Sequence, residues 1–411
     1  MAIKDSFQIP KRYRTWSLAL MAIGIISVII GFIVYGADND VHHKTRFWAT
    51  MLHNSVYFLL IANACMFFIA VTTLAHDRWQ MAFRRVPEAI SQAVIPLGII
   101  ALIVLLAIAF GGHHMTHIYH WTDTAAVEND AILKGKSGFL NTTFFAVWTS
   151  LAILLWIGLG IKMRQLSHQI DSGGMETLEA RKKYIWKNTV WAALFLVWFA
   201  LTVMSTVPWL WLMSIDAHWY STMYSWYTFA STWVAGLALI ILFVVYLKNN
   251  GYLPYTNQEH LHDLGKFMFA FSVFWTYLWF SQYMLIWYAN IPEETTYFKN
   301  RTQGPYSGVF WFGFIINFLA PLLLLMKREA KRNYGTITIM SLVIIFGHWL
   351  DFHQMIFASV QPEHVELNLF DFGVALGFVG TIMFVTSNVL SKYPLVSENH
   401  PFVKESIIHH T

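Results

Sequence analysis

The strongest chemical signal in the sequence is a group of ionisable side chains inside an apolar segment. The run GHWLDFHQM contains His348, Asp351 and His353. His348 and Asp351 are three residues apart, so a helix places both on one face, whereas His353 points nearer the opposite side. A carboxylate among apolar residues must be paired, protonated or in contact with water. Histidine titrates near neutral pH, so this pair is suited to accept protons from quinol oxidation or to relay protons across a membrane.

Other polar residues occur in or beside the apolar segments, and alternating helix directions would bring all of them to one outer layer. These residues are His53, Asn54, Gln282, Tyr283, Glu293, Glu294 and Asp371. Ordinary alternatives exist, because a boundary tyrosine can belong to an aromatic belt and glutamates that follow a proline can cap a helix. With the three residues above, they are the predicted quinone-binding or proton-relay residues. We predict no catalytic residue and no metal ligand.

The composition requires a membrane environment for the helices that carry these residues. Hydrophobic residues make up 56% of the 411 residues and charged residues 12%, whereas a soluble domain has about 25% charged residues. A membrane-spanning helix needs about twenty apolar residues. We therefore predict an all-α polytopic membrane protein with about ten transmembrane helices, at 15–36, 47–75, 87–110, 139–161, 188–212, 223–247, 264–290, 306–326, 335–357 and 367–390.

The basic residues predict the orientation of these helices. With the N-terminus inside, 21 of the 27 Lys and Arg residues fall in inside segments and 6 in outside segments. Cytoplasmic loops carry the excess of basic residues. We therefore expect both termini on the cytoplasmic side of a multi-pass protein. The net charge of +4 is small and its basic residues are spread over many loops, so we expect no nucleic-acid partner.

The predicted helices form a single integral membrane domain over residues 1–411. Helices two to five and six to nine would have the same topology, which is compatible with two repeated four-helix bundles and with peripheral first and tenth helices. The single cysteine, Cys65, and the absence of a C-x-x-C-H sequence predict that no cofactor is covalently bound.

Three stretches give the sequence a family resemblance. They are WFSQYMLIWYANIPEETT at 279–296, the GHWLDFHQM run and DAHWYSTMYSW at 216–226. Together with the ten-helix layout they resemble the NrfD-like, polysulfide-reductase-type membrane subunits of bacterial alternative complex III, a quinol:cytochrome c oxidoreductase. The chain looks like the shorter of the two such subunits in that complex.

The resemblance implies a place in the bacterial inner membrane, two four-helix bundles with flanking helices, and a set of partners. These are an iron–sulfur protein, haem c subunits and the larger, ActC-like subunit, with membrane lipids around them. Haem c and iron–sulfur clusters would belong to the partners. A quinone, menaquinone or ubiquinone, would be the diffusible cofactor. Electrons would pass to cytochrome c or to an oxygen reductase.

Our main functional hypothesis is therefore a membrane subunit of a quinol-oxidising respiratory complex that takes part in quinone binding, in proton translocation or in both. Here Asp351 and His348 would accept protons, and His53 and Tyr283 would line the cavity. The exit to the periplasm would be formed by Glu293 and Glu294. Two alternatives stay open. One is a secondary transporter, which predicts a polar site near mid-membrane on broken helices, and the other is a purely structural anchor of the redox complex.

Overall fold

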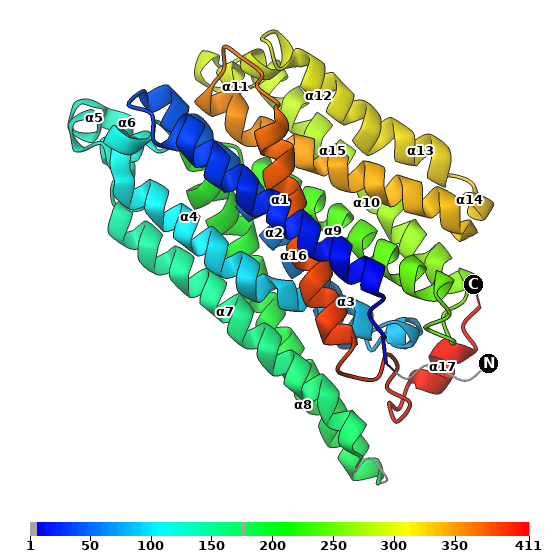
Figure 1. Ribbon diagram of the computed structural model, residues 1–411. Helices are drawn as coiled ribbons and strands as arrows, with labels where there is room; N and C mark the ends of the chain where they lie inside the picture. Colours follow the sequence, from blue (N-terminus) through cyan, green and yellow to red (C-terminus); the bar gives the residue numbers. More distant parts are fainter. Residues whose placement is uncertain (1–5, 174–176, 411) are drawn as a thin grey trace.

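The computed structural model describes residues 6–173 and 177–410, and within these ranges the chain is helical and contains no strand (Figure 1). The long helices are α1 (Lys11–Gly31), α2 (Val41–Leu74), α4 (Val94–Met115), α7 (Thr142–His168), α8 (Leu178–Leu201), α9 (Met223–Asn249), α10 (Gln258–Ala289), α15 (Tyr334–Val360) and α16 (Leu369–Leu390). Shorter helices are α3 (Arg85–Ile90), α5 (Thr124–Asn129), α6 (Ala131–Lys136), α11 (Pro292–Thr302), α12 (Ser307–Phe314), α13 (Ala320–Leu325), α14 (Arg328–Arg332) and α17 (Val403–Ile407). The predicted all-α polytopic membrane fold is confirmed.

Nine helical segments in the described ranges are long and apolar enough to cross a bilayer. They coincide with nine of the ten predicted spans. The predicted span at 264–290 lies on α10, which has 32 residues and lies alongside α9. Its many Trp, Tyr, Ser and Gln residues give it a lower hydropathy than its neighbours. A helix is therefore confirmed at this position, although its composition alone does not mark it as a crossing.

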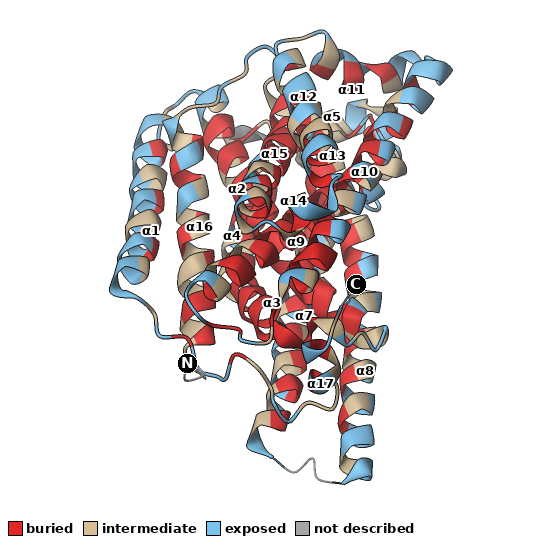
Figure 2. Cartoon of the chain, turned by 90° about the vertical axis from the view of Figure 1, so that its right-hand side faces the viewer, coloured by how far each residue is buried: buried red, intermediate tan, exposed pale blue. Residues whose placement is uncertain are grey.

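The contacts between helices form two groups that share the central helix α2. In the first group α2, α4, α7 and α8 pack together, and in the second α9 packs against α10 and α15 with α12 and α13 at their side. The helix α2 also contacts α9 and α15. Burial follows this arrangement, since 89% of the most apolar window of α9 is buried but only 17% of that of α1 (Figure 2). The core of the molecule therefore lies along α2, α9 and α15.

At the edge of the molecule α1 and α16 pack against each other through glycines (Figures 1 and 2). A Cβ atom on Gly24 would lie 2.3 Å from the Cα atom of Gly377, and one on Gly380 would lie 2.7 Å from the backbone nitrogen of Met21. Two backbones can approach this closely only where side chains are absent. This seam holds α1 against α16, and α16 in turn contacts α2 and α3.

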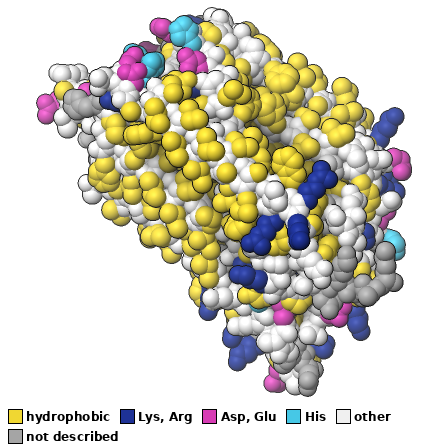
Figure 3. Space-filling view, viewed as in Figure 1, with side chains coloured by type: hydrophobic (Ala, Val, Ile, Leu, Met, Phe, Trp, Pro, Cys, Tyr) yellow, Lys and Arg dark blue, Asp and Glu magenta, His cyan; other side chains and the backbone are white. Residues whose placement is uncertain are grey.

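The two ends of the molecule differ in charge. The chain termini, α14 and α17 lie at one end, and α5, α6 and α11 lie at the other (Figure 1). In Figure 3 Lys and Arg gather toward the end with the termini, Asp, Glu and His gather at the opposite end, and hydrophobic side chains cover the surface between. We call these the basic end and the acidic end. The basic end is the one for which the sequence predicts the cytoplasmic side.

Candidate functional site: a buried carboxylate in the second helix group

A buried carboxylate lies where α9, α10 and α15 meet. Asp351 is 6% exposed and accepts three hydrogen bonds from side chains of the two neighbouring helices. One oxygen accepts from the hydroxyl of Tyr227, and the other accepts from Ser231 Oγ at 3.1 Å and from Trp275 Nε1 at 3.2 Å. Three donors stabilise a carboxylate that would otherwise be very costly in an apolar interior. We call these residues, with His348, the Asp351 cluster.

The imidazole of His348 completes the cluster. Its Nδ1 atom lies 3.0 Å from Ser231 Oγ and 3.9 Å from the nearer oxygen of Asp351. The side chain is fully buried, and Nε2 has no hydrogen-bond partner among the described residues. Because the Ser231 hydroxyl has one hydrogen, it can donate to Asp351 while it accepts from Nδ1–H. The Nε2 atom then carries a free lone pair, so a proton can be taken up there.

From Asp351 toward the acidic end, buried aromatic side chains continue the cluster. The Tyr224 ring lies 6.1 Å from that of Tyr227 and 6.2 Å from that of Tyr297. Trp219 stacks on Tyr297 at 3.9 Å, and the guanidinium of Arg301 lies 3.4 Å from the centre of the same ring. The phenols thus form a column between the carboxylate and the outer helices.

Sequence reasoning found the two α15 members of this cluster and missed the others. Ser, Tyr and Trp are common in membrane helices, so single occurrences carry little information. The available signal was the four-residue spacing of Tyr227 and Ser231, which places both hydroxyls on one face of α9. No sequence pattern could show that this face meets Asp351.

His53 and His353 lie together on another face of α15, between α15 and α2. Their rings are 5.5 Å apart, and His353 stacks on Phe357 at 4.2 Å. His53 Nε2 donates to the carbonyl of Trp349 at 2.8 Å, while neither nitrogen of His353 has a hydrogen-bond partner in the described chain. The structure therefore separates these two histidines from His348, as the helical spacing predicts for His353.

Two further predicted residues have structural partners. Asn54 donates to the Thr50 carbonyl at 3.0 Å and accepts from Trp349 Nε1 at 2.9 Å. Asp371 forms a two-pronged ion pair with Arg46, and it also accepts from the backbone N–H of Asn368 at 3.1 Å, which caps α16. Both side chains are fully buried. Their hydrogen-bonding capacity is used to connect helices.

The remaining predicted residues lie near the junction of α10 and α11. Gln282 is buried and its Nε2 atom has no partner among the described residues. Tyr283 is half-buried, with its ring 5.2 Å from that of Phe298. Glu293 is exposed and Glu294 half-buried in the first turn of α11, where carboxylates interact favourably with the helix dipole. None of these four has a recorded hydrogen bond or ion pair with Asp351 in the described ranges.

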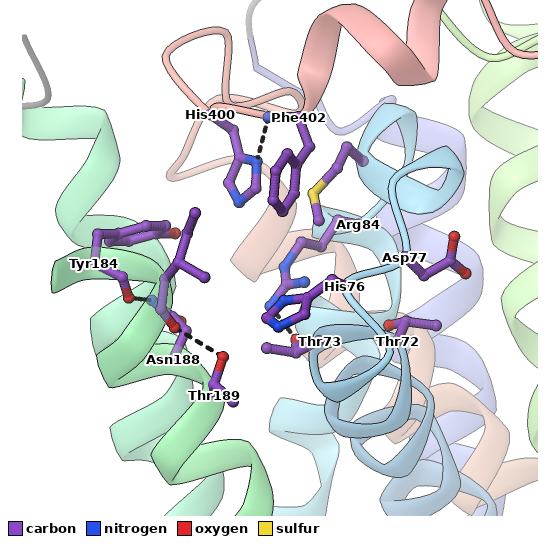
Figure 4. Close-up of a pocket in the computed structure, with 12 residues that line it drawn as sticks. Thr72, Thr73, His76, Asp77, Arg84, Tyr184, Asn188, Thr189, His400 and Phe402 are labelled. Carbon is purple, nitrogen blue, oxygen red and sulfur yellow. Dashed lines mark hydrogen bonds between the residues drawn. The ribbon is translucent and has the colours of Figure 1, made fainter. Parts of the chain in front are cut away.

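A second polar region, separate from the Asp351 cluster, lies at the basic end (Figure 4). This pocket is formed by the end of α2 and the loop that follows, by α8 and by the C-terminal segment, and its volume of about 20 Å³ is enough for one or two waters. Arg84 donates to Thr73 Oγ1 at 3.0 Å, and His400 Nδ1 accepts from the backbone N–H of Phe402 at 3.2 Å. Figure 4 shows His400 and Arg84 facing the same opening.

Acid should loosen the C-terminal segment at this pocket. Burial lowers the pKa of His400 to about 3, with a further decrease from the Arg84 guanidinium. The folded state keeps His400 neutral, whereas the unfolded segment protonates near pH 6.5. The C-terminal segment is therefore most stably docked above about pH 6.5. Below this pH the equilibrium constant for docking falls, by up to about tenfold per pH unit for one proton. Hydrogen-exchange protection factors of residues 397–407 between pH 7.5 and 5 measure this effect.

The matched variants isolate His400 as the group that titrates. His400→Asn keeps an acceptor near the Nδ1 position and should remove the pH dependence. His76→Asn changes an exposed histidine of the same pocket and should leave the dependence intact. A protection profile of the unmodified chain that is flat over this pH range would contradict the prediction.

The sequence matches no family model, and it has no significant match among curated proteins. The Asp351 cluster is therefore the most specific basis for a functional inference.

Proposed function

We propose that the chain is an ActF-type membrane subunit of a quinol-oxidising respiratory complex of the alternative complex III type, and that it moves protons through the Asp351 cluster. The observation that carries the proposal is a buried carboxylate that accepts hydrogen bonds from exchangeable protons on two other helices. Ionisable groups in a membrane interior are costly and usually mark a pathway or a relay. If Asp351 only filled space between the helices, an apolar residue of similar volume would serve as well.

The cluster can transfer a proton by short steps. A proton that arrives at His348 Nε2 allows the Nδ1 proton to pass to Ser231 Oγ over 3.0 Å, and the hydroxyl proton of Ser231 passes to Asp351 over 3.1 Å. Tyr227 donates to the other carboxylate oxygen at rest, so onward transfer requires its hydroxyl hydrogen to turn toward the acidic end and the carboxyl group to rotate until its proton faces the phenol oxygen. The carboxyl proton then passes to Tyr227 as the phenol releases its own. Loss of this proton toward the acidic end and return of His348 to its first tautomer complete the cycle. Each donor and acceptor is within hydrogen-bond reach of the next.

Polar groups extend this line toward the basic end. The amide of Asn317 is fully buried, and neither of its polar atoms has a partner within the described chain. Its Oδ1 atom lies against Gly347, where a Cβ atom would be only 2.1 Å away. Gly347 precedes His348, whose Nε2 is also unpartnered. Further along, Ser341 Oγ lies 3.9 Å from the sulfur of Met268. Unpaired buried amides require solvent or a ligand, so Asn317 supports a proton supply to His348 from this side.

Electron transfer in this proposal belongs to the partners. An iron–sulfur protein, haem c subunits and an ActC-like subunit would carry the electrons from menaquinol or ubiquinol to cytochrome c or to an oxygen reductase. The chain would then contribute protonic coupling or a quinone contact within the bacterial inner membrane. The His53–His353 pair, which lies between the two helix groups, is the alternative polar surface for a quinone carbonyl.

A secondary transporter is the second candidate, because three apolar helical segments of the described ranges depart from regular α geometry. Wider π-helical turns occur at Phe32–Gly36, at Thr202–Leu212 around Pro208, and at Ile315–Leu319. Transporters bind their substrates where helices are interrupted near mid-membrane. The interruption at Ile315–Leu319 contains Asn317, so this reading places a small polar substrate beside His348.

Purification from native membranes distinguishes the two candidates. A tagged chain that belongs to the redox complex should co-purify with a haem c absorbance band and with iron–sulfur signals in electron paramagnetic resonance. The tag is best placed after the C-terminus, which lies at the end of the molecule with α14 and α17 (Figure 1). A chain that is purified alone and colourless under mild detergent would overturn the complex-subunit proposal.

A further inference from the structure

A large cavity lies at the acidic end, away from the Asp351 cluster. It has a volume of about 490 Å³ and is open on one side. Its walls come from α6 and the following loop, from the end of the π-helical stretch Thr202–Leu212, and from the segment before α9. This volume is in the range of small-molecule sites, which is about 300–1,000 Å³. The cavity is lined by the rings of Phe139, Trp209, Trp219 and Tyr220.

The location favours a molecule from the bilayer. Trp209 and Tyr220 are 43% and 61% exposed, at the level where the helices α7 and α9 begin. Tryptophan and tyrosine at such positions meet the boundary between acyl chains and headgroups. The lining is mostly apolar, and the hydroxyl of Ser214 already donates to the Leu210 carbonyl at 2.5 Å. A water-soluble metabolite would therefore find few neutral partners beyond the hydroxyls of Tyr220, Ser221 and Thr222. An acyl chain needs no hydrogen bonds and matches the aromatic walls.

The rim of the cavity has one cation with an anion near it. Lys136 Nζ donates to the Ala217 carbonyl at 2.5 Å and lies 5.9 Å from the centre of the Tyr220 ring. Two ammonium hydrogens remain for another acceptor. The carboxylate of Asp216, next to Ala217, interacts with Lys136 electrostatically. A second carboxylate, Asp130, is engaged by His218 at 2.5 Å. The cavity lining therefore includes one ammonium group, and the carboxylate of Asp216, beside the lining residue Ala217, lies within electrostatic range of it.

We propose that this cavity binds one phospholipid with a protonated amine in its headgroup, of the phosphatidylethanolamine type. An acyl chain would fill the aromatic cavity, the phosphate would contact Lys136, and the amine would contact Asp216. This pairing places a phosphate near the Lys136 ammonium and an amine near the Asp216 carboxylate beside it, whereas a purely anionic lipid would match only Lys136 and an uncharged quinone neither. The bound lipid would fix α6 and its loop against the segment that precedes α9. The proposal is independent of redox function and needs only the membrane location.

Retention of lipid by the purified chain tests this site. The chain, or the complex that contains it, is placed in nanodiscs of mixed phosphatidylethanolamine, phosphatidylglycerol and ubiquinone. It is then transferred to detergent, and native mass spectrometry measures the mass of the protein with any molecule that it retains. We expect one phosphatidylethanolamine per chain to survive the transfer. Gly135→Trp should lower this occupancy at least tenfold, because Gly135 lines the cavity and a Cβ atom there meets open space.

Two comparisons make the test specific. Gly138→Trp is the matched control, since a Cβ atom at Gly138 also meets open space but the residue does not line the cavity; this variant should retain the lipid. Lys136→Gln should reduce the occupancy severalfold. Equal retention by Gly135→Trp and the unmodified chain would overturn the proposal, and so would preferential retention of phosphatidylglycerol or ubiquinone. Each readout is a bound mass and does not depend on turnover.

Discussion

Replacement of Asp351 by asparagine is expected to lower the proton-coupled turnover of the assembled complex at least tenfold. Asparagine cannot ionise, so the step from Ser231 to Tyr227 loses its acceptor. The amide oxygen can still accept from Ser231 Oγ, now at 3.1 Å, so the helices should pack as before. Loss of a positioned proton-transfer group typically costs about 10²–10⁴ in rate. Quinol-driven reduction of the acceptor, together with proton release from proteoliposomes, measures the effect.

The controls separate chemistry from packing. Glu293→Gln makes the same chemical change at an exposed position of α11 and should leave turnover unchanged, although the sequence predicted this residue as part of an exit. Ser231→Ala should reduce turnover as well, because it removes the bridge between His348 and Asp351. Normal turnover and normal proton release in Asp351→Asn would exclude the relay and would favour the structural-anchor alternative.

The fold was largely predictable because hydropathy and charge act locally along the chain. Nine predicted spans coincide with apolar helices, since a window of about twenty apolar residues has no other stable environment. Prediction from hydropathy is less effective for α10. Trp275 and Gln282 lower its hydropathy, yet both are buried against other helices. Hydropathy describes transfer into lipid, whereas α10 is stabilised in part by contacts within the protein.

The candidate site was predictable only where its residues lie close together in sequence. The three-residue spacing of His348 and Asp351 indicated a shared face, and the structure brings them within 3.9 Å. Tyr227 and Ser231 lie more than a hundred residues earlier, and nothing in their local sequence shows which helix they meet. For Asp371 the sequence suggested proton chemistry but did not indicate an ion-pair partner. In the structure this partner is Arg46, which is distant in sequence and lies on α2.

Asp371→Ala is expected to cause the largest loss of stability among the predicted site residues. Arg46 is 1% exposed, and its guanidinium pairs with Asp371, with Glu366 at 3.1 Å and with the ring of Phe357 at 4.7 Å. Removal of one partner of a buried ion pair costs about 3–5 kcal/mol, and here Arg46 would keep only the half-exposed Glu366 as a carboxylate partner. The variant also loses a cap of α16, worth about 1 kcal/mol. Thermal unfolding of the purified protein in detergent measures this change.

A double variant then distinguishes a structural pair from a functional one. Arg46→Met with Asp371→Leu replaces the ion pair by apolar side chains of similar volume, a change that is often neutral or stabilising for a buried pair. We expect it to recover most of the lost unfolding temperature and to restore turnover in the complex. Glu366→Gln, at a side chain that is 47% exposed, should cost much less. If Asp371 instead relays protons, the double variant will be stable and inactive, because no titratable group remains at that position. Recovery of both stability and turnover would therefore assign Asp371 to the packing of α16 on α2 and leave Asp351 as the proton-carrying carboxylate.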